Sequence, residues 1–193
     1  MTRAVAALAL SAGAAAAFLI PGAARWLEYD RAALAGGEVW RLLTGHVAHW
    51  SVEHLAWDLI AFVALGVLCE CLSRVRFLAC VGGGALTVSL TLWWAMPGLE
   101  RYRGLSGLDS ALFVLLAVSL MRRGDSRRIF AGAWALVAFL AKLAWEGATG
   151  GTLFVHDAGL SAVPLAHLAG ALAGFAAGAP RLRQPLVGSG AVA

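Results

Sequence analysis

The sequence predicts an all-α membrane protein, built as a bundle of six transmembrane helices. Of its 193 residues, 61% are hydrophobic and only 13% are charged, whereas a soluble domain is about half apolar and a quarter charged. The apolar residues also gather in six long blocks. Because a backbone in lipid must satisfy its own hydrogen bonds, these blocks are expected to be helices.

Each apolar block approaches the length needed to cross about 30 Å of hydrocarbon. In chain order, the predicted spans are Ala4–Ile20, His54–Glu70, Val75–Met96, Leu105–Met121, Ile129–Trp145 and Ala158–Ala179. The first block, preceded by Arg3 and followed by small residues, also has the features of a signal peptide, and that alternative stays open. The blocks predict a single transmembrane domain over residues 1–180 and a short disordered tail over residues 181–193.

The distribution of arginine predicts how the chain is oriented in the membrane. If the N-terminus is cytoplasmic, the inner segments carry nine arginines and the outer loops five, which is the arrangement that the positive-inside rule favours. The connection over residues 122–128 alone carries four. Both termini are therefore predicted to be cytoplasmic. The formal charge of +4 follows from this topology, and no basic stripe interleaved with aromatic residues indicates nucleic-acid binding.

The cysteines and histidines do not form a recognisable metal or disulfide pattern. There are three cysteines and no C-x-x-C pair, so neither a disulfide framework nor a zinc site is indicated. A metalloprotease is one alternative, with His46, His49 and His54 as ligands beside Asp58, but the chain has no H-E-x-x-H motif. We expect no metal and no cofactor.

Polar side chains inside membrane spans are costly, so each is a candidate for function. In this chain they are His54, Asp58, Ser106, Asp109, Ser110, Lys142 and His167. In the predicted topology the second, fourth and sixth spans all begin on the outer side, which places these groups in the outer half of the membrane. A transporter would more often place such groups at the midplane.

Small residues on the sixth span predict which face meets the fourth. Gly170, Gly174 and Gly178 follow His167 along one stripe of a helix, and such stripes let membrane helices approach closely. The fourth span opens with Gly104-Leu105-Ser106-Gly107. If the two helices meet, an imidazole lies beside a serine hydroxyl, as a Ser–His nucleophile and base require. The oxyanion would be held by the Ser106 amide and His54.

Three of these motifs, in this order, resemble the rhomboid family of intramembrane serine proteases. The resemblance covers about Val39 to Gly178 and rests on Trp40-Arg41, His49-Trp50-Ser51-Val52-Glu53-His54-Leu55, Gly104-Leu105-Ser106-Gly107 and Ala166-His167-Leu168-Ala169-Gly170-Ala171-Leu172-Ala173-Gly174. It implies a rhomboid-like bundle, a catalytic pair of Ser106 and His167, and transmembrane substrates. It also implies structural roles for Trp40, Arg41, Glu70, Gly104, Gly107, Gly170 and Gly174. Rhomboid-like proteins without catalysis, which bind membrane clients, are the alternative; they usually lack the Ser or the His.

Within the family, the segment Arg103–Phe113 and the pair Trp57-Asp58 look like the rhombosortase branch. That resemblance implies cleavage of exported bacterial proteins that end in a Gly-Gly motif, an apolar helix and a basic cluster. The site would open to the periplasmic side of the inner membrane. The sequence indicates no oligomeric state.

Two positions depart from the common rhomboid pattern. Many members have Asn where Asp58 stands, and an ionised Asp58 would repel an oxyanion; we expect that it orients His54 from one turn away. Many also carry a Tyr where Ser110 follows the nucleophile. We therefore expect Asp109 or Ser110 to orient His167, as the third member of a triad does.

Overall fold

Nearly all of the chain that the structure describes is helical. The computed structural model describes residues 4–122, 125–153 and 162–179. The elements are α1 Val5–Leu19, α2 Ala23–Leu27, β1 Tyr29–Asp30, α3 Arg31–Ala35, α4 Arg41–Thr44, the 3-10 turn η1 Gly45–Val47, α5 Val52–Leu72, α6 Arg74–Ala95, β2 Arg101–Tyr102, α7 Ser106–Met121, α8 Ser126–Thr149 and α9 Pro164–Gly178.

Each of the six predicted apolar blocks contains one long helix. Helices α5, α6 and α8 are long and apolar enough to cross a membrane. Helices α1, α7 and α9 have 15, 16 and 15 residues, fewer than the roughly 20 that a full crossing needs. The described residues thus give three candidate spans and three shorter apolar helices, and the six crossings remain a prediction. The beginning of the sixth predicted span and the predicted C-terminal tail lie outside the described residues.

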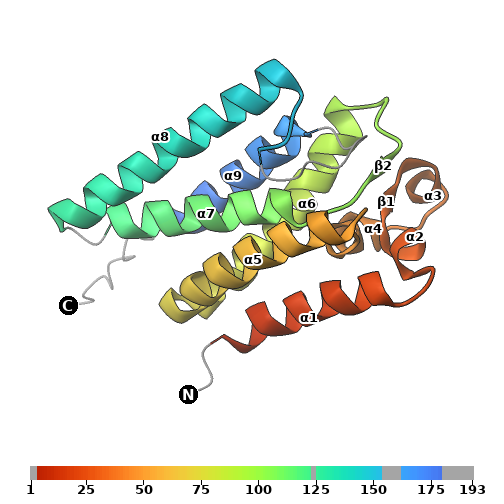
Figure 1. Ribbon diagram of the computed structural model, residues 1–193, viewed down its shortest axis with the longest axis horizontal. Helices are drawn as coiled ribbons and strands as arrows, with labels where there is room; N and C mark the ends of the chain where they lie inside the picture. The colour runs from red at the N-terminus through yellow and green to blue at the C-terminus, as the bar shows by residue number, and fades with distance from the viewer. Residues whose placement is uncertain (1–3, 123–124, 154–161, 180–193) are drawn as a thin grey trace, which may run out of the picture.

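Helix α7 lies inside the bundle and contacts α5, α6, α8 and α9. In Figure 1, α8 runs along one side of α7, and α5 runs along the other, with α1 beyond it. The short elements from α2 to α4 gather at one end, where β1 pairs antiparallel with β2. The segment before α7 is therefore attached to the long first loop.

The contact between α7 and α9 depends on glycine, as the stripe of small residues predicts. A Cβ added at Gly170 would overlap the carbonyl oxygen of Gly107, and one added at Gly174 would overlap that of Ala111. Both obstacles are backbone atoms of α7, so neither can move aside as a side chain can. The two helices thus approach more closely than any other residue type would allow.

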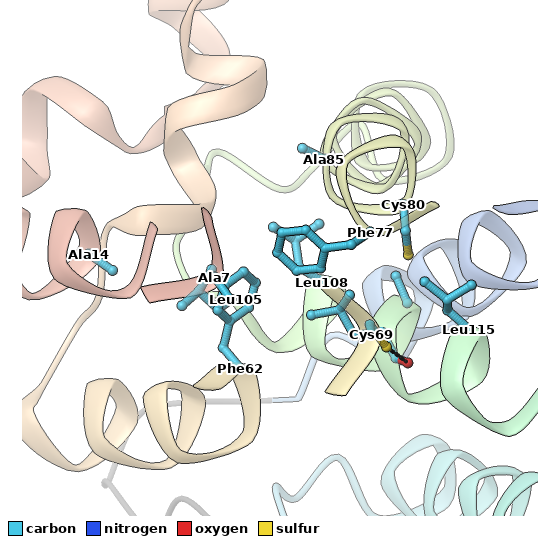
Figure 2. Close-up of a cluster of buried hydrophobic side chains, with 12 residues drawn as sticks. Ala7, Ala14, Phe62, Cys69, Phe77, Cys80, Ala85, Leu105, Leu108 and Leu115 are labelled. Carbon is cyan, nitrogen blue, oxygen red and sulfur yellow. Dashed lines mark hydrogen bonds between the residues drawn. The ribbon is translucent and has the colours of Figure 1, made fainter. Parts of the chain in front are cut away.

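Apolar side chains from four helices fill the centre of the molecule. Figure 2 shows Ala7 of α1, Phe62 of α5, Phe77 of α6 and Leu108 of α7 converging there. The rings of Phe62 and Phe77 meet edge to face, with centroids 6.5 Å apart. Because Leu108 belongs to this core, the core packs against the start of α7 and fixes the position of that helix.

The residues that the rhomboid resemblance marks as structural make defined contacts. Arg41 is buried and donates to the backbone carbonyls of Arg25 and Glu28, each at 2.9 Å. Trp40 stacks on Trp26, with ring centroids 5.4 Å apart. These contacts hold the first loop in a defined shape.

Glu70 fixes the start of α1. Its carboxylate accepts hydrogen bonds from the amides of Ala6 and Ala7 at 3.2 and 2.9 Å. The first amides of a helix lack partners within the helix, and a carboxylate there also interacts favourably with the helix dipole. Glu70 therefore joins the C-terminal end of α5 to the beginning of α1.

His46 is a fully buried histidine of the first loop. Its Nε2 lies 3.1 Å from both the carbonyl oxygen of Ala85 and the hydroxyl of Ser89. Burial lowers the pKa of His46 from 6.5 to about 4. The unfolded chain therefore binds a proton that the folded chain does not bind between these two pH values, so His46 destabilises the fold as the pH falls.

This linkage predicts an acid-sensitive step in stability. As the pH falls from 6.5 to 4, the free energy of unfolding should drop by about 3 kcal/mol on account of His46 alone. The variant His46→Gln keeps a donor for Ala85 but cannot titrate. We expect its thermal midpoint in detergent to fall less between pH 7 and pH 4.5 than that of the wild type. Equal falls would contradict this account of His46.

Candidate active site

Ser106 and His167, predicted from two separate motifs, lie in hydrogen-bond contact. The Ser106 hydroxyl is 3.1 Å from His167 Nε2. Ser106 is the first residue of α7, and His167 lies in the first turn of α9. The sequence predicts His167 about two turns into its helix, but Ala162 and Val163 are not helical and α9 begins only at Pro164. Proline is favoured there because its fixed φ suits the first helical position.

The turn before Ser106 depends on a glycine with positive φ and on a buried carboxylate. Gly104 has φ +125°, which side chains rarely allow, and a Cβ there would come within 2.6 Å of His54 Nε2. The amide of Leu105 donates to Asp58 Oδ2 at 2.7 Å. Gly107 packs against Val88 of α6 and the Ala166 carbonyl of α9. Together these contacts fix the position from which the Ser106 hydroxyl approaches His167.

Asp58 also receives two histidines. Its Oδ2 lies 3.1 Å from His49 Nε2 and 3.3 Å from His54 Nε2. The predicted contact between Asp58 and His54 is therefore present, one helical turn apart on α5. The contact with His49 comes from the preceding loop. Among the described residues, no group of three His, Cys, Asp or Glu side chains is arranged to hold a metal ion.

The side chain that contacts His167 Nδ1 is neither Asp109 nor Ser110, the two residues expected to orient it. His167 Nδ1 lies 2.9 Å from Glu146 Oε2 on α8, a residue that the sequence reasoning did not consider. Ser110 instead donates to the Ser106 carbonyl oxygen at 2.9 Å. Asp109 is buried, and its Oδ1 has no hydrogen-bond partner within the described ranges. The sequence contains one signal for Glu146, its i, i+4 spacing from Lys142. This signal is missed because the fifth span is predicted to end at Trp145, one residue earlier.

A cavity of about 1010 Å³ opens onto the pair. Its lining includes Ser106 and His167, and it continues between α5 and α8 past Ile60 and Phe139. Tyr102 of β2 also lines it. Burial raises the pKa of Tyr102, so its phenol stays protonated. The site therefore combines the Ser106–His167 pair with a cavity that is lined largely by apolar side chains.

All of these groups lie at one end of the bundle. His54, Ser106 and His167 lie in the first turns of α5, α7 and α9, and Glu146 lies in the last turn of α8, which runs the opposite way. The amide of Ser106 belongs to the first turn of α7, where backbone donors lack partners within the helix. Ser106 and the His54 ring both line the cavity.

Comparison with known proteins agrees with the motifs. The family model described as Rhomboid domain matches residues 36–184. No curated protein sequence matches the chain significantly. The match covers most of the chain, including the second part of the first loop, the start of α7 and all of α9. The chain therefore belongs to the rhomboid family, whose members are intramembrane serine proteases.

Proposed function

We propose that the protein is an active intramembrane serine endopeptidase in which Ser106 is the nucleophile and His167 its base. The distance of 3.1 Å between the Ser106 hydroxyl and His167 Nε2 is the observation that carries this proposal. A serine hydroxyl becomes a competent nucleophile when a neighbouring base takes its proton. The alternative is an inactive member of the family that binds membrane clients. That alternative does not explain why Ser106 and His167 meet inside a cavity.

The reaction is acyl transfer at a peptide bond. His167 takes the Ser106 proton as the oxygen attacks the carbonyl carbon, and the resulting oxyanion is held by the Ser106 amide and His54. His167 then gives its proton to the leaving amine, which leaves an acyl-enzyme. Water, activated by the same imidazole, releases the acid and restores Ser106. The chain's own residues thus supply the nucleophile, the base and the oxyanion donors of these steps.

The substrate is a transmembrane segment that enters sideways. The cavity between α5 and α8 is bounded by apolar side chains such as Ile60 and Phe139, which suits a helix arriving from lipid. The scissile segment must unwind to reach Ser106, and glycine has one of the lowest helix propensities. This supports the rhombosortase resemblance and its substrates with a Gly-Gly motif, an apolar helix and a basic cluster at the C-terminus.

The proposed location is the bacterial inner membrane, with one transmembrane domain over residues 1–180 and both termini in the cytoplasm. The arginine-rich connection between α7 and α8 then faces the cytoplasm. The first turns of α5, α7 and α9 face the periplasm, so the candidate site opens on that side. Exported proteins would be cut after their tails have entered the membrane.

The test is cleavage of a reporter that carries such a tail, co-expressed in bacterial membranes with the wild type or with Ser106→Ala. We expect loss of the tail with the wild type only, and labelling of the wild type alone by a fluorophosphonate probe. A second reporter with the Gly-Gly pair replaced by Leu-Leu should resist cleavage. Equal cleavage by both forms of the protein would exclude Ser106 as the nucleophile.

A further inference from the structure

The carboxylate of Glu146 lies between the candidate base and a cation. One oxygen, Oε2, is 2.9 Å from His167 Nδ1, and the other, Oε1, is 2.6 Å from Lys142 Nζ. The Glu146 side chain is only 2% exposed. Such a buried carboxylate would be costly if it were unpaired. Here each oxygen has a partner, His167 for one and Lys142 for the other. The other face of α8 is apolar.

The donors and acceptors in this chain of contacts allow one arrangement. His167 Nε2 must lack a proton to accept one from Ser106, so Nδ1 carries the ring proton and donates it to Glu146 Oε2. Lys142 has donors only, so Oε1 must accept. An ionised carboxylate accepts on both oxygens and fits both neighbours. The arrangement thus selects the histidine tautomer that the proposed reaction needs.

We propose that Glu146, itself held by Lys142, is the positioning residue of the Ser106–His167 pair, an inference that rests on the proposed function. It holds the imidazole with Nε2 toward the serine hydroxyl. It also faces the positive charge that His167 acquires when it takes the serine proton. Lys142 offsets the cost of burying the carboxylate and fixes which oxygen faces the ring. The reactive set then spans three helices, α7, α9 and α8.

The pairing with Lys142 makes the amide variant unusually informative. In Glu146→Gln the side chain has one acceptor and one donor group. Because Lys142 can only donate, it should attract the amide oxygen and turn the amide NH2 toward His167 Nδ1. That contact requires an unprotonated Nδ1, so the ring proton moves to Nε2, where it blocks proton transfer from Ser106. In the double variant Glu146→Gln/Lys142→Met the cation is gone, so the side-chain amide at position 146 can rotate and place its oxygen toward His167 Nδ1.

The experiment measures the tautomer and the reaction separately. The ¹⁵N NMR spectrum of histidine-labelled protein in detergent, assigned through His167→Asn, reports which ring nitrogen of residue 167 is protonated. We expect Nδ1–H in the wild type, Nε2–H in Glu146→Gln, and a return toward Nδ1–H in Glu146→Gln/Lys142→Met. Reporter cleavage should fall about 10²- to 10⁴-fold in kcat/KM in Glu146→Gln, with little change in KM, and recover at least tenfold in the double variant.

Two controls separate positioning from folding. Asp125→Asn makes the same chemical change at the opposite end of α8, at an exposed side chain, and should leave both the tautomer and cleavage as in the wild type. Glu146→Asp should keep the wild-type tautomer. An unchanged tautomer in Glu146→Gln would overturn the proposal. A tautomer switch would support it even in a chain that cleaved no substrate, an outcome that would count against the proposed function alone.

Discussion

Replacing Gly174 by leucine should prevent α7 and α9 from assembling and abolish cleavage completely. Even a single Cβ at this position overlaps the carbonyl oxygen of Ala111, and a leucine adds three more carbon atoms. Overpacking inside a core that can adjust costs about 1–3 kcal/mol, but here the obstacle is backbone. The helices would have to separate, and the hydrogen bond between Ser106 and His167 joins those same two helices.

The matched control is Gly83→Leu, because a Cβ at Gly83 of α6 meets no atom within 4 Å. It should elute as a single species in detergent, keep its thermal midpoint and react with a fluorophosphonate as the wild type does. Gly174→Leu should be degraded or elute as aggregate, and Gly174→Ala should fall between the two. A folded, probe-reactive Gly174→Leu would show that the approach of α7 and α9 tolerates a side chain.

The features that could be predicted from the sequence are those that depend on local patterns of residues. Apolar blocks predict helices because lipid leaves the backbone no other partner, and each predicted block contains one. The glycine stripe beside His167 predicts a close helix contact, and Gly170 and Gly174 make it. Ser106 and His167 could be paired from sequence because the predicted topology places both in the outer half of the membrane, next to small residues.

The features that the sequence could not give depend on contacts between distant segments. Glu146 lies one residue beyond the predicted end of its span, and nothing in the pattern says that α8 continues to Thr149. Arg31 donates to the carbonyls of Leu92, Trp93, Met96 and Leu99 at the end of α6, which no spacing rule anticipates. Local spacing also leads to one wrong expectation. Asp109 is close to Ser106 along α7, but this proximity does not bring it to His167.

Contacts between distant segments also explain why the long first loop is ordered. Glu28 is buried and pairs with Arg103, with the Arg103 Nε 2.7 Å from its carboxylate. Arg103 also lies over the Trp50 ring, 4.1 Å from its centroid. These contacts join the first loop to the residues just before the nucleophile. The first loop thus supports the candidate site, although it supplies neither Ser106 nor His167.

Asp58→Ala should leave the fold weakened and slow cleavage at least 10²-fold, because Asp58 is the acceptor that positions the turn before Ser106. Its loss leaves the buried amide of Leu105 without its partner, and an unsatisfied buried group costs about 1–3 kcal/mol. It also frees the rings of His49 and His54. A displacement of reacting groups by about 1 Å can cost 10²-fold in rate.

Asp58→Asn distinguishes this anchoring role from a role of the charge itself. An asparagine oxygen in the position of Oδ2 can still accept the Leu105 amide proton, and it can also accept a proton from a ring nitrogen of His49 or His54. We expect cleavage within about tenfold of the wild type, since the position of the turn and not the charge then sets the rate, as in the many rhomboids that carry Asn here. The measurement is kcat/KM for the tail reporter, with thermal midpoints of both variants. If Asn proved as damaging as Ala while the protein stayed folded, the carboxylate charge would be what matters, and Asp58 would act through that charge and not only as an anchor for the turn.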